Sequence, residues 1–170
     1  MPAFSMASPD PVKGASRDKA ACLRALAANP DDVGLLSDLG WACRANGEPM
    51  AAEAAFRRAI ALEPAAEAAR YGLAVTCLRR GKVEEGIQHI RVCLERAPAN
   101  HAYWTVLAKL HRNSGRIAEA RDHLRTAMAL APDDSRTAQR MLFQSLLDAR
   151  VSPVEVRREH ESWAARFAAP

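Results

Sequence analysis

Small and apolar residues recur along this chain in a pattern whose unit is 34 residues long. Within one unit they are spaced three or four positions apart, as in Leu36, Leu39 and Cys43, which places them on one face of a helix. Prolines and glycines separate the helices: Pro30, Pro64, Pro98 and Pro132, with Gly47, Gly81 and Gly115 midway between them. The pattern therefore predicts pairs of amphipathic helices, each joined at a glycine and ended by a proline.

This pattern predicts an all-α fold in which successive helix pairs stack into a solenoid. We expect helices at about 33–46, 49–62, 67–80, 83–96, 101–114 and 117–130. Small residues at one position of the first helix in each pair, namely Gly40, Ala74 and Ala108, let the helices approach closely. A single hairpin cannot bury its apolar faces alone, so neighbouring hairpins must pack against each other.

The segments outside these helices complete the expected organisation. Residues 1–15 are rich in proline and small residues and predict a flexible tail. A helix is expected from Ser16, as N-cap, to about Ala28, forming a half repeat at the start of an array over 16–134. The full repeats of this array cover 33–66, 67–100 and 101–134. Residues 135–170 predict an atypical fourth repeat with helices at about 135–148 and 153–167, which caps the array.

The repeated unit resembles the tetratricopeptide repeat, whose period is also 34 residues. The matching positions are Leu36, Arg70 and Trp104 at the tryptophan position; Leu39-Gly40, Leu73-Ala74 and Leu107-Ala108 at the leucine–glycine pair; Cys43, Cys77 and His111 at the tyrosine position; and Phe56, Ile90 and Leu124 at the phenylalanine position. Arg70 departs from the pattern, because a charge replaces a large apolar residue. The resemblance implies a right-handed solenoid, an α-α superhelix, that acts as a protein-interaction module.

The C-terminal stretch 142–167 resembles a second family feature. It is similar to the segment that joins tetratricopeptide repeats to the catalytic lobes of SPINDLY and O-GlcNAc transferase-like glycosyltransferases. The resembling residues are Leu142, Phe143, Ser152, Pro153, Glu155, Val156, His160, Trp163, Arg166 and Phe167. The resemblance implies a role in presenting protein substrates to such a transferase. The asparagine ladder of the family's groove is replaced here by Asp38, Gly72, Val106 and Arg140.

The charge balance narrows the classes of partner. Lys and Arg number 24 and Asp and Glu number 20, which gives a formal net charge of +4. Both signs alternate along the predicted helices, as on a solvated face, so we expect no nucleic-acid partner. No apolar run approaches the roughly 20 residues of a membrane span, and no secretory signal is visible, so we expect a cytoplasmic protein without a membrane partner.

The candidate chemical groups favour a structural role. Cys22, Cys43, Cys77 and Cys93 form no CxxC pair and occupy predicted core positions, so we interpret them as small buried side chains. The five histidines lack the spacing of a helical metal site. No nucleophile elbow, phosphate loop or dinucleotide motif is present. We therefore expect no enzyme activity, no metal site and no cofactor.

A binding surface is the remaining functional prediction. The first helix of each tetratricopeptide pair lines the concave face, and helical spacing places four positions of each repeat along one stripe. The predicted partner-binding residues on this stripe are Trp41, Arg44, Tyr71, Lys109, Arg112, Arg136 and Gln139. Aromatic and arginine side chains dominate binding hot spots. We therefore predict a protein or peptide ligand with apolar anchors and acidic residues.

Self-association is the alternative function. Val154, Trp163 and Phe167 give the last predicted helix an apolar character. This helix could cover a second copy of the chain instead of capping its own repeats, which would make the protein a homo-oligomeric scaffold or assembly subunit.

Overall fold

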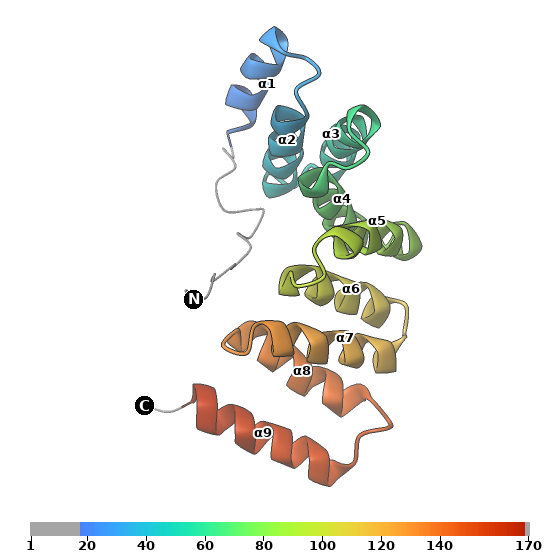
Figure 1. Cartoon of the computed structure of the whole chain (residues 1–170), viewed down its shortest axis with the longest axis vertical. Coiled ribbons are helices and arrows are strands. Elements are labelled where there is room, and N and C mark those ends of the chain that lie inside the picture. Colours follow the sequence, from blue (N-terminus) through green and yellow to red (C-terminus); the bar gives the residue numbers. More distant parts are fainter. Residues whose placement is uncertain (1–17, 169–170) are drawn as a thin grey trace, which may run out of the picture. The chain divides into compact units, whose positions relative to one another are not determined.

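The computed structural model describes residues 18–168, and the described part is built from nine α-helices (Figure 1). Their bounds are α1 Lys19–Ala28, α2 Val33–Ala45, α3 Pro49–Leu62, α4 Glu67–Arg80, α5 Val83–Arg96, α6 His101–Asn113, α7 Ile117–Leu130, α8 Ser135–Leu147 and α9 Pro153–Phe167. The expected all-α class is confirmed. From α2 to α9, each helix also begins where the sequence pattern places it and ends within one residue of the expected position.

The helices form two compact units, one up to Thr76 and one from Cys77 onward, with the division inside α4. In the first unit, α1 packs on α2 and α2 packs on α3. In the second, the helices from α5 to α9 pack in sequence, each on the next. This nearest-neighbour packing is the arrangement that stacked hairpins require.

Helix ends follow local rules of backbone chemistry. Gly47, Gly81 and Gly115 adopt positive φ angles of 77°, 72° and 77°, which confirms that glycine relieves the turn inside each hairpin. Carboxylate, amide and hydroxyl oxygens accept backbone N–H groups at helix starts; the capping residues are Asp18, Asp32, Asn100, Asp134 and Ser152. Each cap satisfies a donor that the helix itself leaves unpaired.

The start of α1 corrects one expectation. We expected Ser16 to cap this helix, but α1 begins at Lys19 and the side chain of Asp18 accepts the N–H of Ala20 at 2.9 Å. Aspartate is as good an N-cap as serine and lies closer to the apolar face that begins at Cys22, which is buried. Ser16 and the tail predicted at 1–15 lie outside the described residues.

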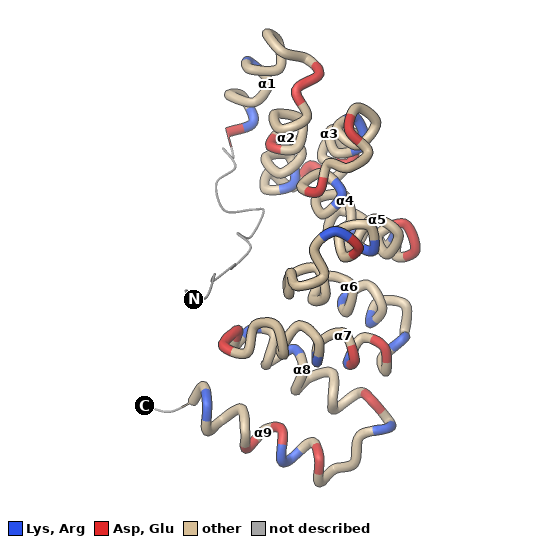
Figure 2. The backbone as a smooth tube through the Cα atoms, viewed as in Figure 1, with Lys and Arg blue, Asp and Glu red and all other residues tan. Residues whose placement is uncertain are grey.

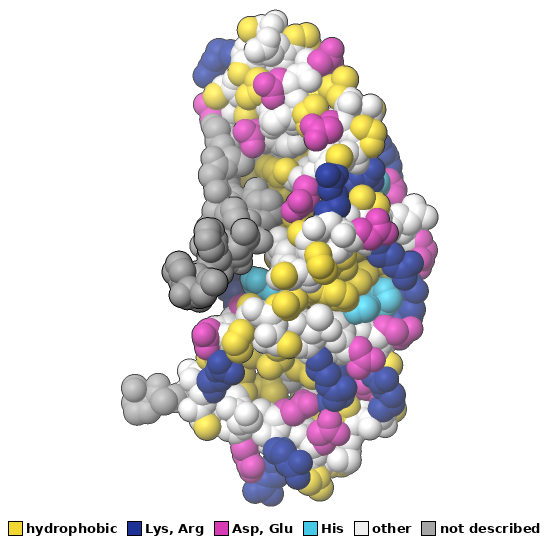
Figure 3. All heavy atoms as spheres, in the orientation of Figure 1, with side chains coloured by type: hydrophobic (Ala, Val, Ile, Leu, Met, Phe, Trp, Pro, Cys, Tyr) yellow, Lys and Arg dark blue, Asp and Glu magenta, His cyan; other side chains and the backbone are white. Residues whose placement is uncertain are grey.

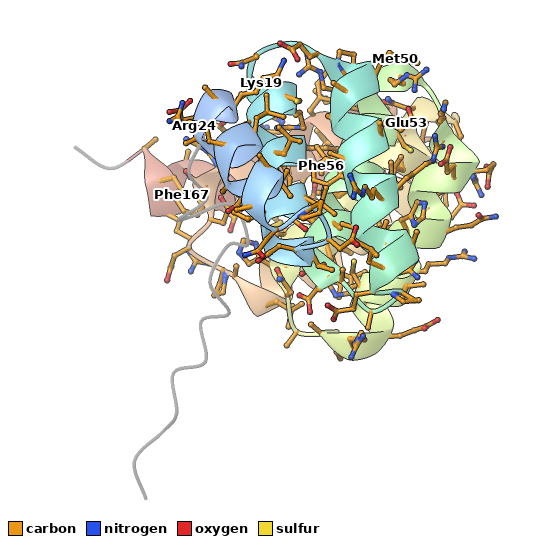
Figure 4. The ribbon with its side chains drawn as sticks, turned by 90° about the horizontal axis from the view of Figure 1, so that it is seen from above. Lys19, Arg24, Met50, Glu53, Phe56 and Phe167 are labelled. Carbon is orange, nitrogen blue, oxygen red and sulfur yellow. The ribbon has the colours of Figure 1, made fainter. Side chains whose placement is uncertain are left out.

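Phe56 of α3 is the centre of the first unit. It is fully buried and lies against two glycines, Gly40 of α2 and Gly72 of α4. A Cβ atom added to either glycine would lie 2.4 Å or 2.3 Å from the phenyl ring. Figure 4 shows Phe56 directed inward from α3, whereas Met50 lies at the outer side of the same helix. Because glycine has no side chain, Gly40 and Gly72 leave the space that the ring occupies.

The second unit uses the same device with different residues. Gly86 of α5 lies against Leu110 of α6, and a Cβ atom there would be 2.8 Å from Leu110 Cδ2. Further along, Ala108, Leu124 and Met141 form a buried cluster that joins α6, α7 and α8. All four cysteines are buried, as expected from their core positions.

Arg70, the departure from the repeat pattern, has a structural explanation. Its Nε donates a hydrogen bond to the carbonyl of Pro64 at 2.5 Å. Trp104, at the same repeat position, donates from its indole Nε1 to the carbonyl of Pro98 at 2.7 Å. Arginine and tryptophan thus make the same bond to the proline that closes the preceding unit, and the guanidinium replaces the indole as a donor.

A pair of histidines is packed into the second unit. His111 is buried, and its ring meets that of His123 edge-on at 4.8 Å, while Trp104 stacks beside His123. Neither ring nitrogen of His111 has a hydrogen-bond partner among the described residues. Burial lowers the pKa of both histidines below the ordinary value of 6.5. Burial therefore favours the neutral form of both imidazoles.

Ion pairs attach the last helix. None of the residues of α9 is buried. Arg121 of α7, only 3% exposed, donates to Glu155 at 2.9 Å, to Glu159 at 2.6 Å and to Ser145 at 3.1 Å. In the loop before α9, Arg150 pairs with Asp148 and holds the pKa of that carboxyl at about 2. Polar contacts, more than apolar burial, therefore position α9.

The size of the Phe56 contact gives a stability prediction. We expect Phe56→Ala to lower the free energy of unfolding by about 3–5 kcal/mol, because it opens a cavity between α2, α3 and α4. Urea denaturation followed by circular dichroism measures the change. Met50→Ala on the same helix is the control: Met50 is 64% exposed, and its loss should cost within about 0.5 kcal/mol. A cost below about 1 kcal/mol for Phe56→Ala would contradict the packing described.

The histidine pair predicts a loss of stability in acid. The unfolded chain takes up protons below about pH 6.5, whereas the buried imidazoles of the folded chain resist protonation. Their contribution to the free energy of unfolding is therefore present above this pH and is lost as the pH falls. We expect the free energy of unfolding to drop between about pH 7.5 and 5.5 and the drop to shrink in His111→Phe. Urea titrations at both pH values measure it, with the exposed His160→Gln as control. An equal drop in His111→Phe would exclude this role for His111.

Candidate functional site

The predicted binding residues of the first unit form a packed cluster. Trp41 and Tyr71 are only 4% and 8% exposed. Their rings lie 5.7 Å apart, and Trp41 also meets Phe56 edge-on at 5.5 Å. The guanidinium of Arg44 stacks over Trp41 at 5.1 Å. Trp41 therefore lies beneath Arg44, and a partner would reach this half-buried cation more easily than the two buried rings.

The predicted residues of the second unit are more accessible. Lys109 is half-buried, and Arg112, Arg136 and Gln139 are exposed. Lys109 and Arg112 of α6 line a shallow depression of about 10 Å³ together with Arg140 and Gln144 of α8. Its apolar floor comes from Ala108 and Leu124. The structure thus brings two of the predicted cations together and adds a third from another helix.

The depression concentrates positive charge. It has three cations and no acidic residue in its lining. Arg112 and Arg140 form no ion pair with any residue of the described range. Arg136 lies four positions before Arg140, on the same face of α8, and likewise has no ion pair there. Elsewhere along the backbone acidic and basic residues alternate, as Figure 2 shows. An anion is the group that this arrangement attracts.

Arg140 and Gln144 were not among the predicted site residues. Arg140 occupies the position of the family's asparagine ladder, where the sequence shows only a departure from the family pattern. Gln144 is 2% exposed and donates from Nε2 to the carbonyl of Ile117 at 3.3 Å, which fixes its amide at the edge of the depression. The spacing of Arg136 and Arg140 was the available signal, because residues four apart share a helix face.

No group of three or more His, Cys, Asp or Glu side chains is arranged to hold a metal ion in residues 18–168. Within the same range, no helix combines the length and the apolar character needed to cross a bilayer.

Comparison with known protein families identifies the repeat. A profile described as tetratricopeptide repeat matches residues 37–101 and 93–135, which together span more than half of the 170 residues. The chain therefore belongs to the tetratricopeptide repeat family. A search of curated proteins finds no match.

Solved structures share the fold at low sequence identity. MamA from Desulfovibrio magneticus RS-1 is 16% identical with a TM-score of 0.70, over 88% of this chain and 87% of that one. YrrB, described as a TPR protein with an unusual peptide-binding site, is 15% identical with a TM-score of 0.74, over 88% and 76%. A Thermobaculum terrenum O-GlcNAc transferase is 20% identical with a TM-score of 0.72, but the match covers 88% of this chain and only 27% of the transferase.

The exposure of the cations predicts that they contribute little to folding. We expect Arg112→Glu and Arg136→Glu each to change the free energy of unfolding by no more than about 0.5 kcal/mol, because neither side chain is buried or ion-paired among the described residues. Urea denaturation at neutral pH measures this. A loss above about 2 kcal/mol in either variant would show that the cation has a structural role instead.

Proposed function

We propose that the chain is a protein-interaction module whose second unit binds an acidic segment of a partner protein. The proposal rests on the depression that is lined by Lys109, Arg112, Arg140 and Gln144, because no carboxylate is among its lining residues. A volume of about 10 Å³ holds one water-sized group, so one oxygen of an Asp or Glu carboxylate of the partner would enter it. Arg136 and Gln139 extend the same binding surface along α8.

Arg112 and Arg140 carry charges that no carboxylate among the described residues balances. Like charges on neighbouring helices repel and are unfavourable for folding, so these two guanidinium groups at one depression are better explained by a bound anion than by stability. An arginine can bind a carboxylate through two parallel hydrogen bonds, which adds geometric specificity to the attraction. In the first unit, Trp41, Tyr71 and Arg44 remain candidates for a second contact, with Arg44 as the accessible member.

The similar structures support the class of partner. YrrB is described as having a peptide-binding site, and the present chain shares its fold. The O-GlcNAc transferase match, together with the sequence resemblance of 142–167, favours a narrower version in which the bound segment belongs to a substrate of a glycosyltransferase. Binding of a protein segment is common to both versions.

Charge reversal tests the proposal. A panel of fluorescein-labelled peptides with acidic residues around Leu or Phe anchors is titrated with the full chain by fluorescence anisotropy. We expect acidic peptides to bind, with an affinity that falls as salt is added. Lys109→Glu combined with Arg112→Glu should weaken binding by about tenfold or more, and Arg140→Glu should have an effect of similar direction.

The matched control is Arg157→Glu, an exposed cation on α9 outside the depression, which should change the affinity by less than about twofold. Affinity capture from native extract, with wild type and the Lys109/Arg112 variant as baits, identifies the natural partner by mass spectrometry. Acidic peptides that bind equally to the wild type and the charge-reversed variants would refute the assignment of the site.

An apolar surface on the last two helices favours a second candidate function, self-association. Phe143, Leu146 and Leu147 of α8 and Val154 of α9 are all about half-exposed or more. Large exposed apolar side chains close together mark interaction surfaces. If they mediate assembly, light scattering should show a mass that rises with protein concentration and returns to that of the monomer in Leu146→Glu. A constant monomer mass over the accessible concentrations would exclude this role.

A further inference from the structure

A pocket separate from the cationic depression lies under the C-terminal half of α9. It has a volume of about 430 Å³ and is bounded by α7, α8 and α9. Its apolar wall consists of Met128, Met141, Leu142, Trp163 and Phe167. This volume falls within the range of roughly 300–1,000 Å³ typical of sites for small molecules.

The pocket follows from the way α9 is attached. The ion pairs of Arg121 hold Glu155 and Glu159, in the first half of α9, whereas Trp163 and Phe167 in its second half are only half-buried. The second half therefore leaves space above Met128 and Met141. Methionine side chains are flexible and polarizable, so such a wall adapts to ligands of different shape.

The charged residues of the pocket are mainly basic. Arg125, Arg158 and Arg166 contribute to the lining, and the single carboxylate there, Glu159, is engaged by Arg121. Arg125 and Arg166 have acidic partners of their own. Arg158 has none among residues 18–168. Figure 3 shows hydrophobic atoms with both basic and acidic side chains around them in the lower part of the view.

The indole of Trp163 contributes its ring, and not its N–H, to the pocket. Its Nε1 is shielded from solvent, so a ligand in this solvent-accessible pocket would not reach that atom. The lining therefore offers an apolar wall and an arginine with no acidic partner among the described residues.

We propose that this pocket binds an aliphatic carboxylate of medium chain length, with the carboxylate at Arg158 and the chain against Met128, Met141 and Leu142. Charge complementarity selects an anion, and the apolar wall selects its chain. A peptide would also bring backbone N–H and C=O groups that need partners. Apart from Ser162, the polar groups of the lining that a ligand can reach are charged side chains.

Titration calorimetry of the full chain with decanoate, below its micelle concentration, tests the proposal. We expect saturable binding that is weakened about tenfold or more in Arg158→Glu and nearly unchanged in Arg157→Glu, its neighbour outside the pocket. Ser162→Phe places a bulky ring at the pocket from an exposed position and should abolish binding. Decyltrimethylammonium, with the same chain and the opposite charge, should bind at least about tenfold more weakly.

The outcomes separate the possible occupants. Circular dichroism first establishes that each variant is folded. If Ser162→Phe does not fold, Arg158→Glu still decides the test, because Arg158 is exposed. No saturable decanoate binding, or equal binding by all variants, would overturn the proposal. Binding of an acidic Leu-containing peptide that Ser162→Phe blocks, without decanoate binding, would assign the pocket to a protein segment and also overturn it. A molecular mass in solution that doubles when the pocket is filled would mean that a second copy of the chain occupies the pocket, and it would also overturn the proposal.

Discussion

The close approach of neighbouring helices at small residues is the constraint on which the rest of the structure depends. Gly40 and Gly72 leave room for the ring of Phe56, and Gly86 leaves room for Leu110. A hairpin of this size cannot bury its apolar faces alone, so each helix is stabilised by the next. The side chains that fill these spaces therefore fix the distances at which the polar groups of adjacent helices meet.

The polar features follow from this packing in different ways at different helices. Between α6 and α8, the close arrangement brings Arg112 near Arg140, and neither guanidinium has an ion pair among the described residues. At α9, where no residue is buried, the buried guanidinium of Arg121 provides the attachment through Glu155 and Glu159. The first arrangement favours an external anion, whereas the second satisfies its charges internally.

The two proposed sites differ in the ligand that their walls suit. The depression at Arg112 is small and polar at its rim, which suits one carboxylate of a longer chain. The pocket at Arg158 is far larger and mostly apolar, which suits a molecule that buries an aliphatic chain. Because they use different cations, each can be changed by mutation without changing the other.

The sequence by itself determined the helix boundaries from α2 to α9, the glycine turns with positive φ and the burial of the four cysteines, because these depend on local spacing and backbone chemistry. It also placed Lys109 and Arg112 on one helix face. Only the tertiary structure decided that Arg140 joins them, that Trp41 and Tyr71 are buried, and that a pocket opens under α9. These features depend on which side chains of different helices meet, and a helical period specifies the face of a residue but not its neighbours.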